Sequence, residues 1–280
     1  MTIEVLKGKE LEKTRLLYEE VFHDSREYTD YFYEKIQKQG TAFVVEEDKR
    51  IVSELFLIPK LLSCKDRIME TLYLYGVATK KEYRGQGFMG QLMENALDYA
   101  VKTKAELVYL IPVNENLYRR FGFQTIKQGN THIWELTEKE AEKMLKFNFE
   151  SVSSENFSEE VYREINMLEN KIKEPEEILP FRDREYLIDR IRRAQIEGGG
   201  VYLLRKHDDY MAAGMIMTAK EQGETVILDV IGRKEKREHC IKDFMRWKNS
   251  MRMKEYIFTV MIKTLNGKKA FSTVLLNDEI

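Results

Sequence analysis

The sequence predicts a mixed α/β fold made of two successive domains, each with a mixed, mostly antiparallel sheet flanked by helices. A hydrophobic strand, a glycine loop, an amphipathic helix and a second strand follow one another over residues 71–113. Hairpin signals on both sides of this series add antiparallel strands. A similar series of strands and helices returns after residue 147. With 280 residues, 43% of them hydrophobic, the chain is long enough for two cores.

The other elements of the first domain follow from periodicity and turn residues. They are a strand over 3–6, helices over 11–22 and 28–38, and a hairpin with arms at 42–46 and 51–58. Strands are also expected over 123–127 and 131–136, on either side of Gln128-Gly129-Asn130. Glycine and asparagine favour tight turns, so these two strands are predicted to form the closing hairpin of the domain.

The strand over 71–78 and the glycines after it predict an anion site. Gly76 near the end of the strand indicates a bulge or a close backbone approach. The loop Arg84-Gly85-Gln86-Gly87-Phe88-Met89-Gly90 leads into apolar residues at helical spacing, so a helix is expected from about Gly87. Free amides at its N-terminus, the helix dipole and Arg84 together suit a pyrophosphate.

Gly85, Gly87 and Gly90 also have the spacing of the dinucleotide-binding fingerprint. In that fold the glycines follow the strand at once, and an acidic residue ends the next strand. Here residues 79–84 intervene, and the next strand, over 107–113, is followed by Asn114. The context therefore argues against a dinucleotide site. A surface turn before a core helix remains the simpler alternative.

Arg84-Gly85-Gln86-Gly87-Phe88-Met89 resembles the phosphate loop of the GNAT family of acetyl-CoA-dependent N-acetyltransferases, whose pattern is Gln/Arg-x-x-Gly-x-Gly/Ala. Residues 114–123 are similar to the family's Asn-x-x-x-Tyr-x-x-x-Gly-Phe ending, and residues 77–79 to the strand that pairs with the pantetheine arm. Met89 departs from the small residue of the pattern. The resemblance implies acetyl-CoA as co-substrate, no metal, and cofactor contacts at Val77, Ala78, Thr79, Arg84, Gly85, Gln86, Gly87, Met89, Gly90 and Asn114.

Acetyl transfer to an amine needs a stabilised oxyanion and a proton for the departing thiolate. By the same resemblance Tyr118 faces the sulfur and is the general acid; the alternative is a ring that only packs under the Phe121-Gly122-Phe123 turn. A bulge near Val77 or Ala78 would turn a backbone amide toward the oxyanion. As bases, Glu54 and Glu70 are the candidates, although each is more simply a solvated strand residue.

Composition is that of an intracellular enzyme, so a cytoplasmic location is expected. Lys and Arg number 46 against 48 Asp and Glu, a balance that argues against a nucleic-acid binder. No apolar run reaches the length of a membrane span, so no membrane partner is expected. Cys64 and Cys240 lack the spacing of a zinc site or disulfide framework, and the four histidines lack metal-site spacing.

The second half is predicted to be a degenerate copy of the first. Domain limits are expected at 1–137 for the domain with the acetyl-CoA site, 138–146 for a linker helix opened by the capping box at Thr137, and 147–280 for the copy. Its expected elements are a strand over 149–152, helices over 161–172, 186–191 and 241–247, and strands over 201–205, 211–218, 225–231, 256–262 and 270–276. Its loop, 231–238, has only Gly232 to expose amides.

Tandem domains of which one lacks the loop are similar to the enhanced-intracellular-survival type of GNAT protein, a comparison that Arg182-Asp183-Arg184-Glu185-Tyr186-Leu187 fits weakly. That type has a C-terminal sterol-carrier-like domain and places its terminal carboxylate in the active site as a base. This chain ends at Ile280, before any such domain is expected, so the carboxylate's role is not carried over.

The sequence thus favours an N-acetyltransferase acting on a primary amine: a small amine, an aminoglycoside-like polyamine or a lysine side chain. A non-catalytic acyl-CoA sensor or scaffold is the alternative. Segments 22–33 and 61–70 are predicted to be the loops that select the acceptor. Arg119 and Arg120 either meet the 3′-phosphate of CoA or face solvent, and sheet edges make a homo-oligomer possible.

Overall fold

The computed structural model describes residues 3–64, 67–172, 178–206, 212–232, 236–258 and 260–265. These residues form two compact units with a mixed sheet each, which confirms the predicted fold class. The first unit holds the described residues of Met1–Lys127, Ile178–Pro180 and Thr259–Val274, and the second those of Gln128–Glu177 and Phe181–Phe258. The units interleave along the chain, whereas the expected domain limits, 1–137, 138–146 and 147–280, are continuous; those limits remain a prediction.

The first sheet has the order β1-β2-β3-β4-β5-β14-β6, with β9 paired to β3. All described neighbours are antiparallel except β4 and β5. The strands are β1 (Ile3–Lys7), β2 (Thr41–Glu47), β3 (Arg50–Cys64), β4 (Arg67–Thr79), β5 (Leu107–Leu110), β6 (Gln124–Lys127), β9 (Ile178–Pro180) and β14 (Val260–Thr264).

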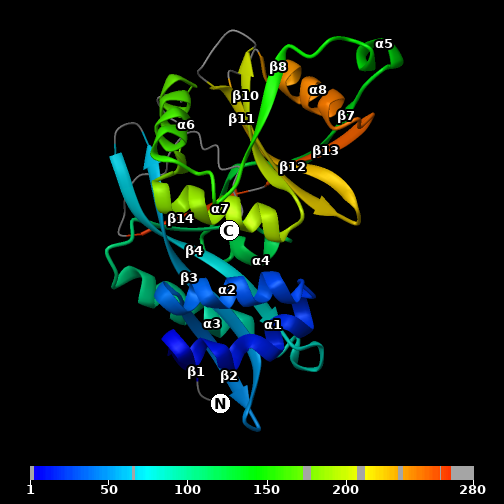
Figure 1. Cartoon of the computed structure of the whole chain (residues 1–280). Helices are drawn as coiled ribbons and strands as arrows, with labels where there is room; N and C mark the ends of the chain where they lie inside the picture. The colour runs from blue at the N-terminus through cyan, green and yellow to red at the C-terminus, as the bar shows by residue number, and fades with distance from the viewer. Residues whose placement is uncertain are drawn as a thin grey trace. The chain divides into compact units, whose positions relative to one another are not determined.

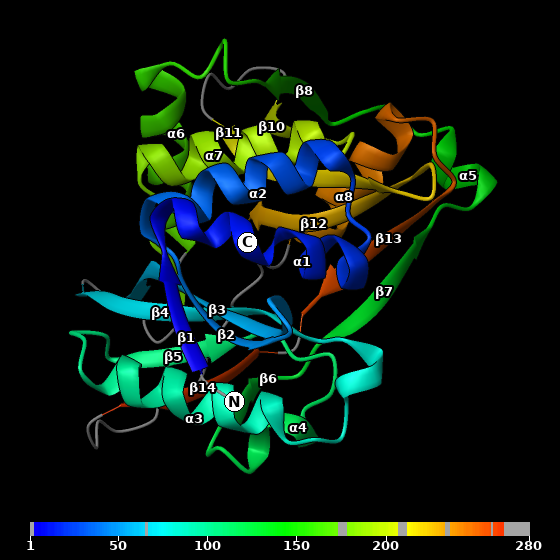
Figure 2. The ribbon, with the colours of Figure 1, turned by 90° about the horizontal axis from the view of Figure 1, so that it is seen from below.

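Helices cover both faces of this sheet, as Figure 2 shows. On one face lies α3 (Phe88–Val101), whose apolar side packs with β2–β5 in a core that includes Leu92, Met93 and Leu57. On the other face lie a 3₁₀ helix (Gly8–Thr14), α1 (Arg15–Phe22) and α2 (Arg26–Gln39). The short α4 (Asn116–Arg119) follows β5.

The second sheet has the order β7-β13-β12-β11-β10-β8, in which only β12 and β13 are parallel. Its strands are β7 (Asn130–Glu135), β8 (Phe147–Val152), β10 (Gly200–Lys206), β11 (Ala212–Glu221), β12 (Glu224–Gly232) and β13 (Arg252–Ile257). Both sheets therefore contain one parallel pair beside a run of antiparallel strands. The predicted strand over 270–276 lies outside the described residues.

Separate helices cover the two faces of the second sheet (Figure 1). α6 (Glu159–Ile172) and α7 (Arg184–Ile196) pack on one face, and α8 (Arg237–Trp247) packs on the other. The capping box at Thr137 forms as predicted, but the helix that it opens, α5 (Glu138–Ala141), is a single turn. No helix among the described residues is long and apolar enough to cross a membrane.

The predicted closing hairpin is wrong. β6 and β7 flank Gln128 and Gly129 but belong to different sheets, and β14 lies between β5 and β6. The expected strand over 256–262 is likewise divided into β13 and β14, one in each sheet. β7 is mostly exposed, whereas Val260 and Met261 of β14 are fully buried, so burial favours β14 at the inner position.

Strands β3 and β4 are longer than the strands predicted over 51–58 and 71–78, and they pair with each other. Their ladder runs from Ser53 with Thr79 to Cys64 with Arg67, so the described part of 61–70 is strand and not the expected acceptor loop. β9 extends the sheet beside Leu62–Cys64. In these extensions the buried residues Leu62 and Met69 alternate with exposed residues. This alternation is the pattern of a β-strand.

Candidate active site

Strands β4 and β5 separate at the centre of the first sheet. Their parallel pairing ends at Tyr73 with Tyr109, whereas β4 continues to Thr79. Beyond Tyr73 the edge of β4 that faces β5 has no ladder partner among the described strands. Apart from the Thr79 carbonyl, which accepts from Arg84, the backbone groups on this edge can pair with another extended chain. The first sheet is therefore open between β4 and β5 beyond this pair.

A β-bulge lies in the separated part of β4. Glu54 pairs with Ala78 but Phe56 pairs with Tyr75, so Gly76 and Val77 lie opposite the single residue Leu55. Gly76 has φ +58°, a conformation that glycine adopts without cost. The bulge expected from the sequence is confirmed, and it turns the local backbone groups away from the regular ladder.

The glycine loop lies at the N-terminus of α3. Gly85 and Gly87 have φ of +80° and +83°, and a Cβ on either would meet no atom within 4 Å. Gly87 is the N-cap of α3 and supplies no capping side chain, so the amides of the first turn keep no intrahelical partner. The loop thus presents uncovered amides at the positive end of a fourteen-residue helix.

Other predicted cofactor residues hold the loop and the neighbouring turn in place. Arg84 donates from Nε to the carbonyl of Thr79 (3.1 Å), and the Thr79 hydroxyl bonds to that of Ser53 (2.8 Å). Gln86 donates to the carbonyl of Glu82 (3.5 Å). Asn114 accepts from the backbone of residue 116 (3.0 Å) and so begins α4. The arginine therefore ties the end of β4 to the start of the loop.

Tyr118 is buried in the α3-side core. Its ring meets that of Phe123 edge-on, with centroids 6.2 Å apart. No described residue hydrogen-bonds to its hydroxyl, and burial raises the pKa of the phenol above its usual value. A phenol with a raised pKa is protonated at neutral pH. The structure thus contains both the expected ring packing and an uncommitted proton donor.

The glycine loop, the separated strands and the bulge lie within the part of the chain that a family model matches. Residues 2–126 match the model described as an acetyltransferase (GNAT) domain. Residues 2–126 are a GNAT domain. A search of curated proteins found no match to the chain.

Solved structures show the same fold over nearly the whole chain. A probable N-acyltransferase from Enterococcus faecalis is 16% identical and covers 95% of this chain and 73% of its own, with TM-score 0.73. Eis1 from Mycobacterium abscessus is 9% identical, covering 94% and 74%, with TM-score 0.62. A tandem GNAT protein from the clavulanic acid biosynthesis pathway is 11% identical, covering 96% and 100%, with TM-score 0.58. The two units therefore have a tandem GNAT fold.

Glu54 was expected to be a solvated strand residue, but in the GNAT domain it is buried. Its side chain on β3 is completely buried, and neither carboxylate oxygen has a hydrogen-bond partner among the described residues. Burial raises the pKa of the Glu54 carboxyl well above its usual range. Glu70 is exposed, as expected. Charge and size in the sequence do not distinguish these two strand glutamates, because the helices that cover β3 come from elsewhere in the chain.

Arg119 and Arg120 have different surroundings in the GNAT domain. Arg119 forms an ion pair with Glu115 (2.6 Å). Arg120 lies against the first turn of α3: its Nη2 is 3.9 Å from the sulfur of Met89 and would be 3.2 Å from a Cβ on Gly90. No described carboxylate pairs with Arg120. Arg120 is thus a cation beside the glycine loop, and the lack of a side chain at Gly90 leaves space for its guanidinium.

The second GNAT-like unit repeats the strand geometry of the first in β12 and β13. β12 and β13 are parallel only at two positions, and an extra residue, Leu228, makes a bulge in β12. Residues 233–235 of the predicted degenerate loop lie outside the described residues. Beside the bulge, Asp229 accepts from buried Arg182 (2.9 Å), which also bonds to Glu169 (2.8 Å). This buried charge group was not predicted, since its members are far apart in sequence.

Proposed function

We propose that this protein is an N-acetyltransferase that transfers the acetyl group of acetyl-CoA to a primary amine. The observation that carries the proposal is the combination, in one domain, of a β4 strand that separates from β5, a bulge at Gly76 and an open glycine loop at the start of α3. The GNAT match over residues 2–126 supports acyltransferase activity.

The available backbone groups fit the parts of acetyl-CoA. Residues 77–79 on the unpaired edge of β4 suit the amide-rich pantetheine arm, which could continue the ladder. The amides of Gly85–Gly90 suit the pyrophosphate, because no Cβ covers the two positive-φ glycines and Arg84 adds a positive charge. Met89, which departs from the family pattern, is partly buried against the core.

The chemistry follows from two groups near the bulge. A backbone amide of Val77 or Ala78 stabilises negative charge on the carbonyl oxygen during attack by the amine. Tyr118 gives its proton to the departing thiolate, because its phenol is protonated at neutral pH and its hydroxyl has no hydrogen-bond partner among the described residues. A small amine, an aminoglycoside-like polyamine and a lysine side chain remain the candidate acceptors.

A non-catalytic acyl-CoA sensor is the second candidate, and the packing of Tyr118 favours it. The Tyr118 ring lies in the core against Phe123, which is sufficient to explain a buried aromatic residue without a catalytic role. In that case the GNAT domain binds acyl-CoA, and the second unit holds a protein partner.

The release of free CoA thiol from acetyl-CoA tests the proposal. Polyamines, aminoglycosides and lysine peptides are added in turn, and calorimetry measures acetyl-CoA binding in parallel. Thiol release that depends on an amine supports the transferase and identifies its acceptor class. Tight binding with no release for any amine favours the sensor, and absence of binding contradicts both candidates.

A further inference from the structure

A chain of hydroxyl groups crosses the face of the first sheet that α1 and α2 cover. The Tyr18 hydroxyl donates to Oδ2 of Asp24 (2.8 Å) and lies 3.1 Å from the hydroxyl of Tyr75. Tyr18 has a single hydroxyl proton, which it donates in the hydrogen bond to the Asp24 carboxylate. The hydroxyl of Tyr75 is therefore the donor to Tyr18, which gives the chain a direction from Tyr75 to Asp24.

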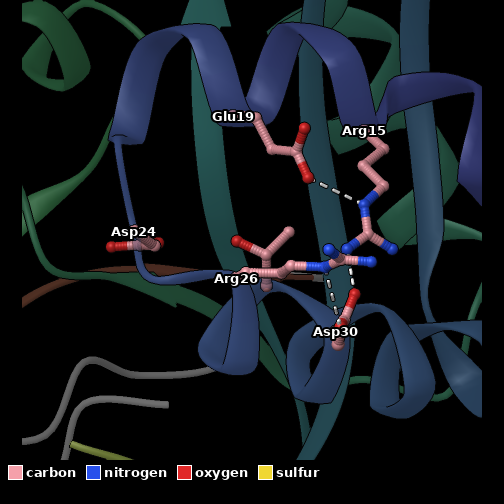
Figure 3. A pocket seen from close by; sticks show the side chains of 6 residues that line it. Arg15, Glu19, Asp24, Arg26 and Asp30 are labelled. Atoms are coloured by element: carbon pink, nitrogen blue, oxygen red, sulfur yellow. Dashed lines mark hydrogen bonds and ion pairs between the residues drawn. The ribbon is translucent and has the colours of Figure 1, made fainter.

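The two ends of this chain lie in different environments. Tyr75 is half-buried on β4, directly before the bulge at Gly76. Tyr18 on α1 is completely buried. Asp24 is exposed on the segment between α1 and α2, where it lines a polar pocket (Figure 3). The other residues that line the pocket are Arg15, Glu19, Arg26, Thr29 and Asp30.

Aromatic packing holds the hydroxyls in line. The Tyr18 ring lies 4.6 Å from that of Phe22 and 4.8 Å from that of Phe32, and Phe22 stacks on Tyr75. The ring centroid of Tyr33 lies 5.8 Å from that of Tyr18, but the Tyr33 hydroxyl is hydrogen-bonded to the Thr14 hydroxyl (2.8 Å) and is not part of the chain. Rings packed in this way hold the hydroxyl groups of Tyr18 and Tyr75 within hydrogen-bond distance inside an apolar interior.

We propose that Tyr75, Tyr18 and Asp24 are the path by which the attacking amine loses its proton, a role that rests on the proposed acetyl transfer. As the C–N bond forms and the C–S bond breaks, the nitrogen gives one proton to the Tyr75 oxygen. Tyr75 passes its own proton to Tyr18, and Tyr18 passes its proton to the Asp24 carboxylate. Asp24 then releases the proton to water in the pocket.

The proton balance of the reaction closes through solvent. The thiolate takes one proton from Tyr118, the amine loses one to Asp24, and water returns the proton from Asp24 to Tyr118. Tyr75 is the catalytic residue of this path because it touches the amine; Tyr18 and Asp24 act through it. The path supplies the base that neither Glu54, whose carboxyl is enclosed in the core, nor exposed Glu70 provides.

Removing the middle hydroxyl tests the path. Y18F keeps the ring and its packing, and Y33F removes a neighbouring buried hydroxyl that is outside the chain. Turnover is measured by thiol release from acetyl-CoA with spermidine, kanamycin and a lysine peptide, in mixtures of H₂O and D₂O. We expect Y18F to lower kcat by about 10- to 100-fold, with an unchanged KM for acetyl-CoA, whereas Y33F stays within about twofold of the wild type.

The isotope mixtures separate proton transfer from a structural role. A path in which several protons move gives a curved dependence of kcat on the D₂O fraction, and Y18F should make it linear. D24N should act like Y18F. A Y18F enzyme with wild-type kcat and an unchanged curve would overturn the path and leave the transferase intact. No thiol release by the wild type with any amine would overturn the transferase and the path together.

Discussion

The ring of Phe56 on β3 fills the space that a side chain on Gly76 of β4 would need. A Cβ at Gly76 would lie 2.6 Å from Cδ2 and 2.9 Å from Cε2 of that ring. Phe56 is itself fully buried among other rings, with Phe32 at 5.6 Å, and cannot move aside at low cost. The bulge that turns β4 is therefore fixed by contact as well as by backbone conformation.

Replacing Gly76 with alanine should destabilise the first unit by about 2–4 kcal/mol, because the new methyl group collides with a rigid ring in addition to straining the backbone. Chemical denaturation measures the loss. Gly8→Ala is the matched control: Gly8 has nearly the same φ, +57°, and no atom within 4 Å of a Cβ. It should cost only about 1 kcal/mol. Equal losses in the two variants would contradict the role of Phe56.

Replacing Tyr118 with phenylalanine should lower kcat by about 10- to 1000-fold and leave the affinity for acetyl-CoA nearly unchanged. The change removes the proton donor and keeps the ring that packs on Phe123. Steady-state thiol release and calorimetry give the two quantities. If turnover is unaffected, Tyr118 is a packing residue and the general acid lies elsewhere.

A leucine in place of Gly87 should weaken acetyl-CoA binding by more than about tenfold, because its side chain would cover the loop amides and strain a backbone at φ +83°. Gly223→Leu provides the control for strain alone, since Gly223 has φ +87° and open space in the turn between β11 and β12. Calorimetry compares the two. Wild-type affinity in the Gly87 variant would contradict the whole cofactor site.

The buried carboxyl of Glu54 should make stability fall as pH rises. Its pKa is raised in the folded state, so the folded protein holds more protons than the unfolded chain above the unfolded pKa of about 4.3. The free energy of unfolding then decreases with pH by up to about 1.4 kcal/mol per pH unit until the raised pKa is passed. E54Q should flatten this decline between pH 5 and 8 in denaturation experiments.

Glu70→Gln is the control for that slope, because Glu70 is exposed on the neighbouring strand. It should leave the pH dependence as in the wild type. The burial argument would be refuted by an E54Q protein whose stability declines with pH as steeply as before.

Arg120→Gln should weaken CoA binding by about 3- to 10-fold, since Arg120 is a cation beside the first turn of α3 and no described carboxylate neutralises it. Arg119→Gln should have less effect, because Arg119 is paired with Glu115. Titration at two salt concentrations checks the electrostatic origin, as the difference should shrink at high salt. A larger loss in the Arg119 variant would reverse this assignment.

Local signals in the sequence were sufficient for the loop and for most elements. The spacing of Leu92, Met93 and Ala96 indicates the buried side of α3, and glycines at 76, 85 and 87 take the positive φ that other residues resist. These features depend on neighbours within a few residues. The Tyr118 position came from resemblance to a family ending, and its environment came from the structure.

The sequence by itself determined the mixed α/β class, the bulge and the glycine loop that opens α3, because backbone conformation and helix periodicity are local properties. Only the tertiary structure decided that β14, and not β7, lies between β5 and β6, that Glu54 is enclosed while Glu70 is exposed, and that Tyr18 links Tyr75 to Asp24. Strand pairing and burial depend on segments far apart in the chain, and the alternation of hydrophobic residues in a strand does not specify which other strand pairs with it.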